Sequence, residues 1–248
     1  MPLPFETDNG IGTRANLGLI ALSTDETLEW ELNRMADADG LALYTSRIPM
    51  VPSITSDTLR QMRADLPTAA SLLPSSVPFD VIGYGCTSAS TVIGPDGVRD
   101  AIREIFPDVQ VTNPISSTIA ACTALGIKRL GFVTPYVAEV SAAMRSLLEE
   151  NGLTISAFGS FEEGDDRVVA RITPASIRQA ARTVASQAAC DAIFISCTNL
   201  RVAGLAADLE RDLGIPVLSS NLTLGWHMLQ LAGIHEPKPQ FGQLFGAS

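Results

Sequence analysis

The chain has 248 residues, a formal net charge of −10 and a sequence pI of about 4.6. This acidic balance argues against nucleic acid or an anionic membrane as a partner, because neither would find a basic patch to bind. No apolar run approaches the roughly 20 residues that span a bilayer, and the first residues lack the apolar core of a secretory signal. We therefore expect a soluble, cytoplasmic, globular protein.

The alternation of short apolar runs with helix-length segments predicts an α/β protein. Residues 1–15 are expected to form an N-terminal arm. The elements expected next are strand 17–22, helix 26–38, strand 41–48, helix 56–73, strand 80–84, helix 96–105, strand 109–112 and helix 115–125. The order then repeats as strand 129–133, helix 137–151, strand 153–158, helix 174–187, strand 192–196, helix 203–213, strand 216–219 and helix 221–231. Each half is expected to form a parallel sheet flanked by helices.

This repeat predicts two half-domains related by a pseudo-two-fold axis. Cys197 follows Cys86 by nearly the same number of residues that separates the first strands of the two halves. We assign residues 16–115 and 221–248 to the first half and residues 116–220 to the second. Ligands of open α/β sheets bind beyond the carboxyl ends of the strands, so we expect the active site in the cleft between the halves.

Two of the four cysteines occupy matching positions at the ends of expected strands. Cys86 and Cys197 each follow an apolar run and a Gly or Ser, and each precedes a Thr. A buried Cys at a strand end is commonly a small hydrophobic residue, which is how we interpret Cys122 and Cys190. The duplicated setting distinguishes Cys86 and Cys197 and makes them the candidate catalytic residues. No Cys or His spacing indicates a metal site, so no metal and no cofactor are expected.

Two opposed thiols permit more than one reaction. A thiolate at a strand end that faces a helix N-terminus has a lowered pKa, and backbone N–H groups there can hold a carboxylate. One thiol could remove a proton next to a carboxylate while the other delivers one from the opposite face. The same pair also suits addition and elimination across a double bond.

Four motifs resemble those of the aspartate/glutamate racemase superfamily. Within it, the chain is most similar to the branch that holds maleate cis–trans isomerases, arylmalonate decarboxylase and racemase-like ectoine-utilisation proteins. The motifs are Tyr84-Gly85-Cys86-Thr87-Ser88, Val133-Thr134-Pro135-Tyr136, Ile195-Ser196-Cys197-Thr198 and Gly214-Ile215-Pro216-Val217-Leu218-Ser219-Ser220.

The resemblance implies a cofactor-independent enzyme with its site between two α/β halves. It also implies that decarboxylases of the branch have Gly at the position of Cys86, so the presence of both cysteines favours isomerisation. In maleate isomerases the residue matching Cys86 adds to the alkene as a thiolate, and the residue matching Cys197 supplies a proton. Family members are commonly dimers or larger, so a homo-oligomer is expected.

Two acids depart from the maleate isomerase pattern. The resemblance implies Asn at the positions of Asp25 and Asp166, where it would contact a substrate carboxylate. An ionised Asp there would repel that group, which favours a substrate with a cationic part. The alternative without a functional role is that both acids are solvated loop residues or helix caps. The Thr-Asp-x-Thr loop and the segment 165–172 are more similar to ectoine-utilisation proteins.

The leading hypothesis is an isomerase or racemase that acts on a small carboxylate or an amino-acid-like substrate, of the ectoine-utilisation type. The alternatives are a non-catalytic binding protein for an ectoine-like metabolite and a maleate cis–trans isomerase proper. The candidate substrate-binding residues, which follow expected strands, are Ser23, Asp25, Thr27, Thr87, Ser88, Asn113, Tyr136, Asp166, Thr198 and Asn199.

Overall fold

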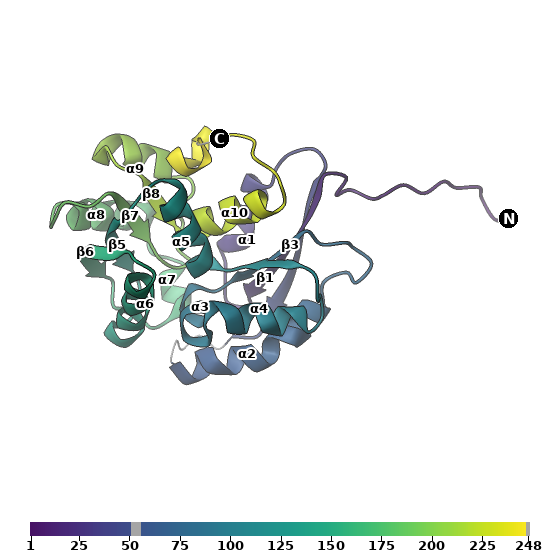
Figure 1. Ribbon diagram of the computed structural model, residues 1–248, viewed down its shortest axis with the longest axis horizontal. Coiled ribbons are helices and arrows are strands. Elements are labelled where there is room, and N and C mark those ends of the chain that lie inside the picture. The colour runs from purple at the N-terminus through teal and green to yellow at the C-terminus, as the bar shows by residue number, and fades with distance from the viewer. Residues whose placement is uncertain (51–55, 247–248) are drawn as a thin grey trace.

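Two four-stranded parallel sheets form the centre of the molecule in the computed structural model, which describes residues 1–50 and 56–246 (Figure 1). The strand orders are β2-β1-β3-β4 and β6-β5-β7-β8, so each strand of the first sheet has a counterpart four places later in the chain. The first sheet contains β1 (Ala15–Leu22), β2 (Leu41–Ile48), β3 (Val81–Gly85) and β4 (Gln110–Thr112). The second contains β5 (Arg129–Thr134), β6 (Thr154–Ser160), β7 (Ala192–Ile195) and β8 (Val217–Ser219). The expected duplicated α/β architecture is confirmed.

Helices cover both sheets. Those of the first half are α1 (Leu28–Met35), α2 (Ser56–Ser71), α3 (Thr87–Ile93), α4 (Pro95–Arg103) and α5 (Pro114–Ala124). Those that follow are α6 (Ala138–Glu150), α7 (Asp166–Val169), α8 (Pro174–Ala185), α9 (Ala206–Leu213) and α10 (Ser220–Leu231), then the short 3-10 helices η1 (Pro239–Phe241) and η2 (Gln243–Phe245). Although α10 follows the second sheet in the chain, it packs against α1, α5, β3 and β4.

The expected strands and the longer helices agree with the structure to within a few residues. Two short helices, α3 and α7, are absent from the sequence prediction. The α3 segment is rich in Ser and Thr, whose hydroxyls turn back onto the chain: Ser90 donates to the carbonyl of Cys86 and Thr91 to that of Thr87. Such residues favour turns over helices when judged locally, so burial of the segment decides its conformation.

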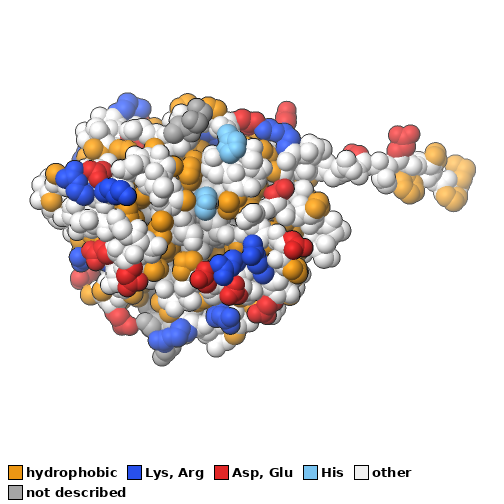
Figure 2. Space-filling model, viewed as in Figure 1, with side chains coloured by type: hydrophobic (Ala, Val, Ile, Leu, Met, Phe, Trp, Pro, Cys, Tyr) orange, Lys and Arg blue, Asp and Glu red, His pale blue; other side chains and the backbone are white. Residues whose placement is uncertain are grey.

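The first 14 residues contain no helix or strand and extend away from the body of the molecule (Figure 1). The arm carries exposed apolar side chains, among them Leu3, Phe5 and Ile11, and Figure 2 shows apolar groups at its tip. Within the described residues, no helix is long and apolar enough to cross a membrane.

Gly85, at the end of β3, marks a close approach between the first sheet and α1. A Cβ on this residue would lie 2.1 Å from Cδ2 of Leu28 and 3.3 Å from the carbonyl oxygen of Ile20. Leu28 is fully buried, so its side chain has no open space to enter. We expect Gly85→Ala to lower the free energy of unfolding by about 1–3 kcal/mol, the usual cost of overpacking a core. Urea-induced unfolding followed by circular dichroism measures this loss.

Gly204→Ala provides the matched control for that experiment. A Cβ on Gly204 would meet no atom within 4 Å, so its free energy of unfolding should change by less than about 0.5 kcal/mol. Equal losses in the two variants would contradict the steric explanation for Gly85.

Candidate active site

The two candidate cysteines come together from the two halves of the chain. Cys86 follows β3 and Cys197 follows β7, which are the matching strands of the two sheets. The hydroxyl of Thr87 donates to Oγ of Ser220 at 2.8 Å, and the same oxygen accepts from the backbone N–H of Cys197 at 3.0 Å. The hydroxyl of Thr198 lies 3.5 Å from the carbonyl oxygen of Gly85. The segments that carry the two thiols are therefore in direct contact.

Cys86 lies at the start of α3 with its thiol turned toward the helix. Its Sγ accepts from the backbone N–H of Ala89 at 3.3 Å and lies 3.5 Å from Oγ of Ser88. Burial raises the pKa of the thiol to about 11, although the contacts with Ser88 and Ala89 act in the opposite direction. The expectation of a lowered pKa at this helix end is wrong, because the cost of burying a thiolate exceeds the stabilisation by the helix.

Cys197 occupies an unusual backbone conformation. Its φ is 130°, in a region that side-chain-bearing residues rarely adopt, and its Sγ accepts from the backbone N–H of Asn199 at 3.4 Å. Residues in such conformations cost about 1–3 kcal/mol and persist only where the surrounding contacts impose them. Burial raises the pKa of this thiol well above its usual value, the carboxyl of Asp166 raises it further, and Tyr136 lowers it. Burial therefore disfavours the thiolate form of both cysteines.

The hydroxyl of Tyr136 lies near both cysteines. The residue follows β5, is 3% exposed, and its backbone N–H donates to Oγ1 of Thr134 at 3.1 Å. Burial raises the pKa of its hydroxyl, and Cys197 and Cys86 raise it further through their negative charge when ionised. Tyr136 and the two thiols therefore belong to one cluster.

The predicted acids also lie at this cluster. Asp25 and Asp166 are 4% and 3% exposed, respectively. Burial raises the pKa of each carboxyl, and the charge of Asp166 raises that of Asp25 further. Both acids also raise the pKa values of Cys86 and Cys197. They are therefore buried neighbours of the thiols and not solvated loop residues, although Oδ1 of Asp25 also accepts from the backbone N–H groups of Thr27 and Leu28 at the start of α1.

Other predicted residues hold the two halves together. Asn199 accepts from the backbone N–H of Glu26 at 2.9 Å through Oδ1, and its amide donates to the carbonyls of Thr24 and Asp166. The hydroxyl of Thr27 donates to the carbonyl of Asn199 at 3.0 Å. These contacts tie the first loop of one half to the Cys197 loop of the other.

Two further predicted residues make structural hydrogen bonds. Asn113 caps α5, with Oδ1 accepting from the backbone N–H groups of Ile115 and Ser116. Ser23 is exposed, and its hydroxyl accepts from the backbone N–H of Met50 at 2.9 Å. The structure therefore gives both residues structural hydrogen bonds, and contact of either residue with substrate stays a prediction.

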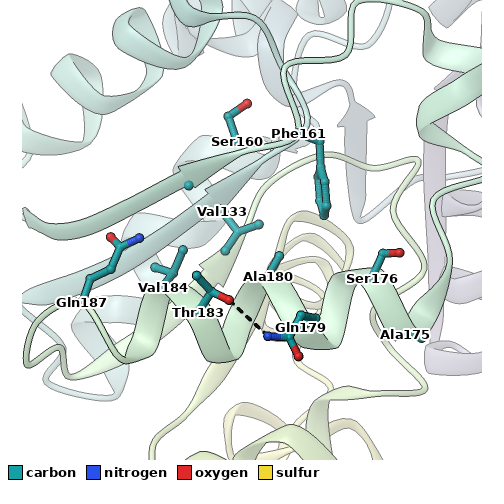
Figure 3. Close-up of a pocket in the computed structure, with 11 residues that line it drawn as sticks. Val133, Ser160, Phe161, Ala175, Ser176, Gln179, Ala180, Thr183, Val184 and Gln187 are labelled. Atoms are coloured by element: carbon teal, nitrogen blue, oxygen red, sulfur yellow. Dashed lines mark hydrogen bonds between the residues drawn. The ribbon is translucent and has the colours of Figure 1, made fainter.

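Two pockets related by the duplication lie beside the long helices. One of about 560 Å³ lies between α8 and the second sheet, where Val133 of the sheet faces Ala180 and Val184 of the helix (Figure 3). Its counterpart of about 310 Å³ lies beside α2 and includes Ser23 and Met50. Neither Cys86 nor Cys197 lines either pocket, so both are separate from the cysteine cluster.

The family model described as arylmalonate decarboxylase matches residues 65–245, a span that includes both cysteines, Tyr136 and Asp166. The chain belongs to the arylmalonate decarboxylase family. A maleate isomerase from Nocardia farcinica is 27% identical over 240 residues, which cover 92% of this chain and 94% of that protein. An arylmalonate decarboxylase from Bordetella bronchiseptica is 26% identical over 194 residues, which cover 77% of each chain.

Solved structures show that this fold is shared with known enzymes. The maleate isomerase Iso from Pseudomonas putida S16 superposes with a TM-score of 0.85 at 23% identity, over 94% of this chain and 98% of that one. A mutant of the Nocardia farcinica maleate cis–trans isomerase with a covalently bound succinylcysteine intermediate gives a TM-score of 0.85 at 25% identity, over 94% and 99% of the two chains. The superfamily resemblance is therefore confirmed, whereas the ectoine-utilisation subgroup is not shown.

Glu31 is a buried acid near the site that does not appear among the residues predicted from the sequence. It lies on α1 and is 1% exposed. Its Oε1 accepts from the backbone N–H groups of Val202 and Ala203, each at 2.9 Å, and its Oε2 from the amide of Asn221 at 2.8 Å. That amide also donates to the carbonyl of Thr198 at 2.8 Å. Glu31 therefore holds the loop that follows Cys197.

A signal for Glu31 is present in the sequence. The residues at 28, 32 and 35 form the apolar face of α1, and Glu31 lies on that same face. An acid on the buried face of an amphipathic helix indicates a buried partner. The partner itself comes from the other half of the chain and has no local signature.

Proposed function

We propose that this protein is a cofactor-independent isomerase or racemase of a small carboxylate, in which the thiols of Cys86 and Cys197 act on opposite faces of the substrate. The observation that carries the proposal is the meeting of two buried thiols from matching strand ends, with Tyr136 beside both. The relatives named maleate isomerases support the isomerase class. The presence of Cys86, where the resemblance implies Gly for decarboxylases, also favours isomerisation.

In racemisation the two cysteines exchange protons with one carbon atom. The thiolate of one Cys takes the proton from the carbon next to the carboxylate, and the electron pair of the C–H bond delocalises into that carboxylate. The thiol of the other Cys then gives its proton to the opposite face of the same carbon. One S–H bond forms and one breaks, so the enzyme ends with the thiol and thiolate exchanged.

In cis–trans isomerisation the same residues act differently. The thiolate of Cys86 adds to one alkene carbon and forms a C–S bond, while the other carbon takes a proton from Cys197. Rotation about the new single bond and the reverse elimination give the trans alkene and restore both cysteines. The solved Nocardia farcinica mutant, with its succinylcysteine intermediate, supports this type of step in the family.

Polar groups around the thiols suit a carboxylate. The hydroxyl of Ser88 lies beside Sγ of Cys86, and the Tyr136 hydroxyl lies near both thiols. Thr198 follows Cys197 and is 3% exposed. We assign these three side chains to substrate binding, because hydroxyl donors can hold a buried carboxylate without a full positive charge.

Incubation of the protein with a panel of small carboxylates in D₂O tests the proposal. The panel contains maleate, D- and L-aspartate and ectoine, and products are followed by chiral chromatography and mass spectrometry. A racemase is expected to place deuterium at the inverted carbon, whereas maleate isomerisation appears as fumarate. Ligand-induced thermal stabilisation without turnover of any panel member, retained in Cys86→Ser and Cys197→Ser, would instead support the non-catalytic binding protein.

The finer part of the proposal is a role in ectoine utilisation, with ectoine or an amino acid derived from it as substrate. The sequence supports it through the loop around Asp25 and the segment 165–172. Maleate isomerase proper is the second candidate, supported by the names of four curated relatives. Formation of fumarate as the main product in the panel would favour that second candidate.

We also propose that the protein is cytoplasmic and assembles as a homodimer or a larger homo-oligomer. The exposed apolar side chains of the N-terminal arm, which extends away from its own body, support contact with a second copy (Figure 2). Size-exclusion chromatography with light scattering measures the mass, and a monomer at high concentration would contradict the assembly.

A further inference from the structure

Two buried carboxyl groups at the cysteine cluster each have an oxygen without a hydrogen-bond partner. Asp25 belongs to the first half of the chain, and Asp166 begins α7 in the second. Oδ1 of Asp25 accepts from the backbone N–H groups of Thr27 and Leu28 at 2.8 and 2.7 Å, which orients the carboxyl. Oδ2 of Asp25 and Oδ2 of Asp166 have no partner within hydrogen-bond distance, although Thr198 lies near the carboxyl of Asp25, and Thr24 and Asn199 near that of Asp166, where each lowers the carboxyl pKa. Buried polar atoms are normally paired, so these two oxygens remain able to accept hydrogen bonds from a bound ligand.

The arginines near these acids are already engaged elsewhere. Among the residues that the structure describes, no ion pair includes the carboxylate of Asp25 or Asp166. Arg47 donates to the backbone carbonyl of Asp25 and not to its side chain. The ion pairs of the neighbouring arginines, at 2.6–2.7 Å, are Arg47–Glu29, Arg167–Asp165 and Arg171–Glu26.

We propose that Asp25 and Asp166 form a subsite for a cationic group, an ammonium or amidinium, so that the substrate is a zwitterion and not a dicarboxylate. This inference rests on the proposed function and names its substrate class. A buried ionised carboxylate is costly unless a counter-charge with hydrogen-bond donors meets it. A substrate cation between the two acids supplies that charge and donates to both unpartnered oxygens.

The same arrangement couples substrate binding to the chemistry of the thiols. The charges of Asp25 and Asp166 disfavour a thiolate at Cys86 and at Cys197. A bound cation offsets these charges and makes a thiolate easier to form. A dicarboxylate would add negative charge at the same place. The acids therefore favour a zwitterion twice, because its cation binds to them and also makes it easier for the cysteines to lose a proton.

The competing explanation is that both acids are protonated and donate hydrogen bonds to a substrate carboxylate, as an amide would. Replacement by Asn separates the two explanations, because Asn keeps the shape, the Oδ1 acceptor and a donor but can carry no charge. A cation subsite loses affinity with Asn, whereas a site that uses neutral acids as donors keeps or gains it.

The test compares probes that differ by one positive charge. Aspartate carries an ammonium where succinate carries hydrogen, and acetamidinium is the charged counterpart of acetamide. Isothermal titration calorimetry at neutral pH is expected to give at least tenfold tighter binding of the cation in one pair or both. Asp25→Asn and Asp166→Asn are each expected to reduce this preference at least tenfold. Equal binding within both pairs, or a preference unchanged in both variants, would overturn the proposal.

Asp165→Asn is the matched control. Asp165 is the neighbour of Asp166, but its carboxylate binds the Arg167 guanidinium at 2.6 Å. Its replacement removes a charge at nearly the same place in the chain and should leave the preference for cations unchanged. The pH profile of Cys86 alkylation gives a second readout in the absence of ligand: Asp25→Asn and Asp166→Asn should lower the apparent pKa, whereas a purely structural role would not move it.

The outcomes also separate this inference from the proposed function. Turnover of maleate that depends on both thiols, with no preference for cations, would retain the isomerase and remove the subsite. Tight binding of a cationic probe without isomerisation of any panel member would retain the subsite and remove the catalytic proposal.

Discussion

Replacing either Cys86 or Cys197 with serine is expected to lower kcat by a factor of about 10²–10⁴, the usual contribution of one positioned acid or base. A serine hydroxyl has nearly the same size as a thiol but a far higher pKa, so it neither adds to carbon nor exchanges protons at a useful rate. Both side chains are 3% exposed, and the substitution changes little of their packing. Turnover of the substrate found in the panel measures the effect, with thermal unfolding as the check on folding.

Cys190→Ser is the matched control for these two variants. Cys190 precedes β7 and is only partly buried, outside the cysteine cluster. Its replacement should leave kcat within a factor of two. Near-normal turnover in either Cys86→Ser or Cys197→Ser would refute the two-thiol mechanism, whichever substrate is used.

The pH dependence of the wild-type enzyme follows from the same thiols. With a pKa of about 11, Cys86 is a thiolate in roughly one molecule in 10⁴ at pH 7. Because kcat/KM reports ionisation in the free enzyme, its logarithm should rise with pH above neutrality with a slope of about one. A flat profile between neutral and alkaline pH would mean that no free thiolate is needed.

The second large effect is expected at Glu31, on the stability of the fold. Glu31→Ala removes the acceptor of three buried N–H donors, on Val202, Ala203 and Asn221. A buried donor without a partner costs about 1–3 kcal/mol, so the loss in the free energy of unfolding should be at least about 3 kcal/mol. Chemical denaturation at pH 6 measures this loss. A loss below about 1 kcal/mol would contradict the role of Glu31 in holding the loop after Cys197.

Glu31→Gln isolates the charge of this side chain. Burial raises the pKa of Glu31 to about 7 from an ordinary value of 4.5, so the folded state holds its proton more tightly than the unfolded state. The stabilisation is fully present below pH 4.5 and is lost as pH rises through about 7, by a total of about 3 kcal/mol. As pH rises through this window, the free energy of unfolding of wild type should therefore fall relative to that of Glu31→Gln. A constant difference would show that Glu31 does not titrate there.

Most of the fold could be predicted from local sequence because its elements have strong local signals. The strands β1, β3, β5 and β7 are short apolar runs, and Gly126 ends α5 with a φ of 67°, as a left-handed cap requires. The helices α3 and α7 have no such signal, since Ser, Thr and Asp favour turns in isolation. Their conformation depends on contacts that the local pattern does not contain.

Some features of the candidate site could likewise be predicted from the sequence, and others could not. The pairing of Cys86 with Cys197 follows from the repeat, because equivalent strands in a duplicated α/β chain end at equivalent places. The sign of the thiol pKa shift did not follow, since it depends on how completely the two halves exclude water. The roles of Asn199 and Glu31 did not follow either, because their partners lie in the opposite half of the chain.

The sequence by itself determined the duplicated α/β scaffold, the two cysteines at matching strand ends and the two acids in the loops. Only the tertiary structure decided that these acids are buried beside the thiols, that one oxygen of each lacks a partner, and that Glu31 fastens the Cys197 loop. The physical reason is the distance along the chain over which each interaction acts. Periodicity and turn chemistry act between neighbours in the chain, whereas burial, desolvation and charge at this site arise where two halves more than a hundred residues apart meet.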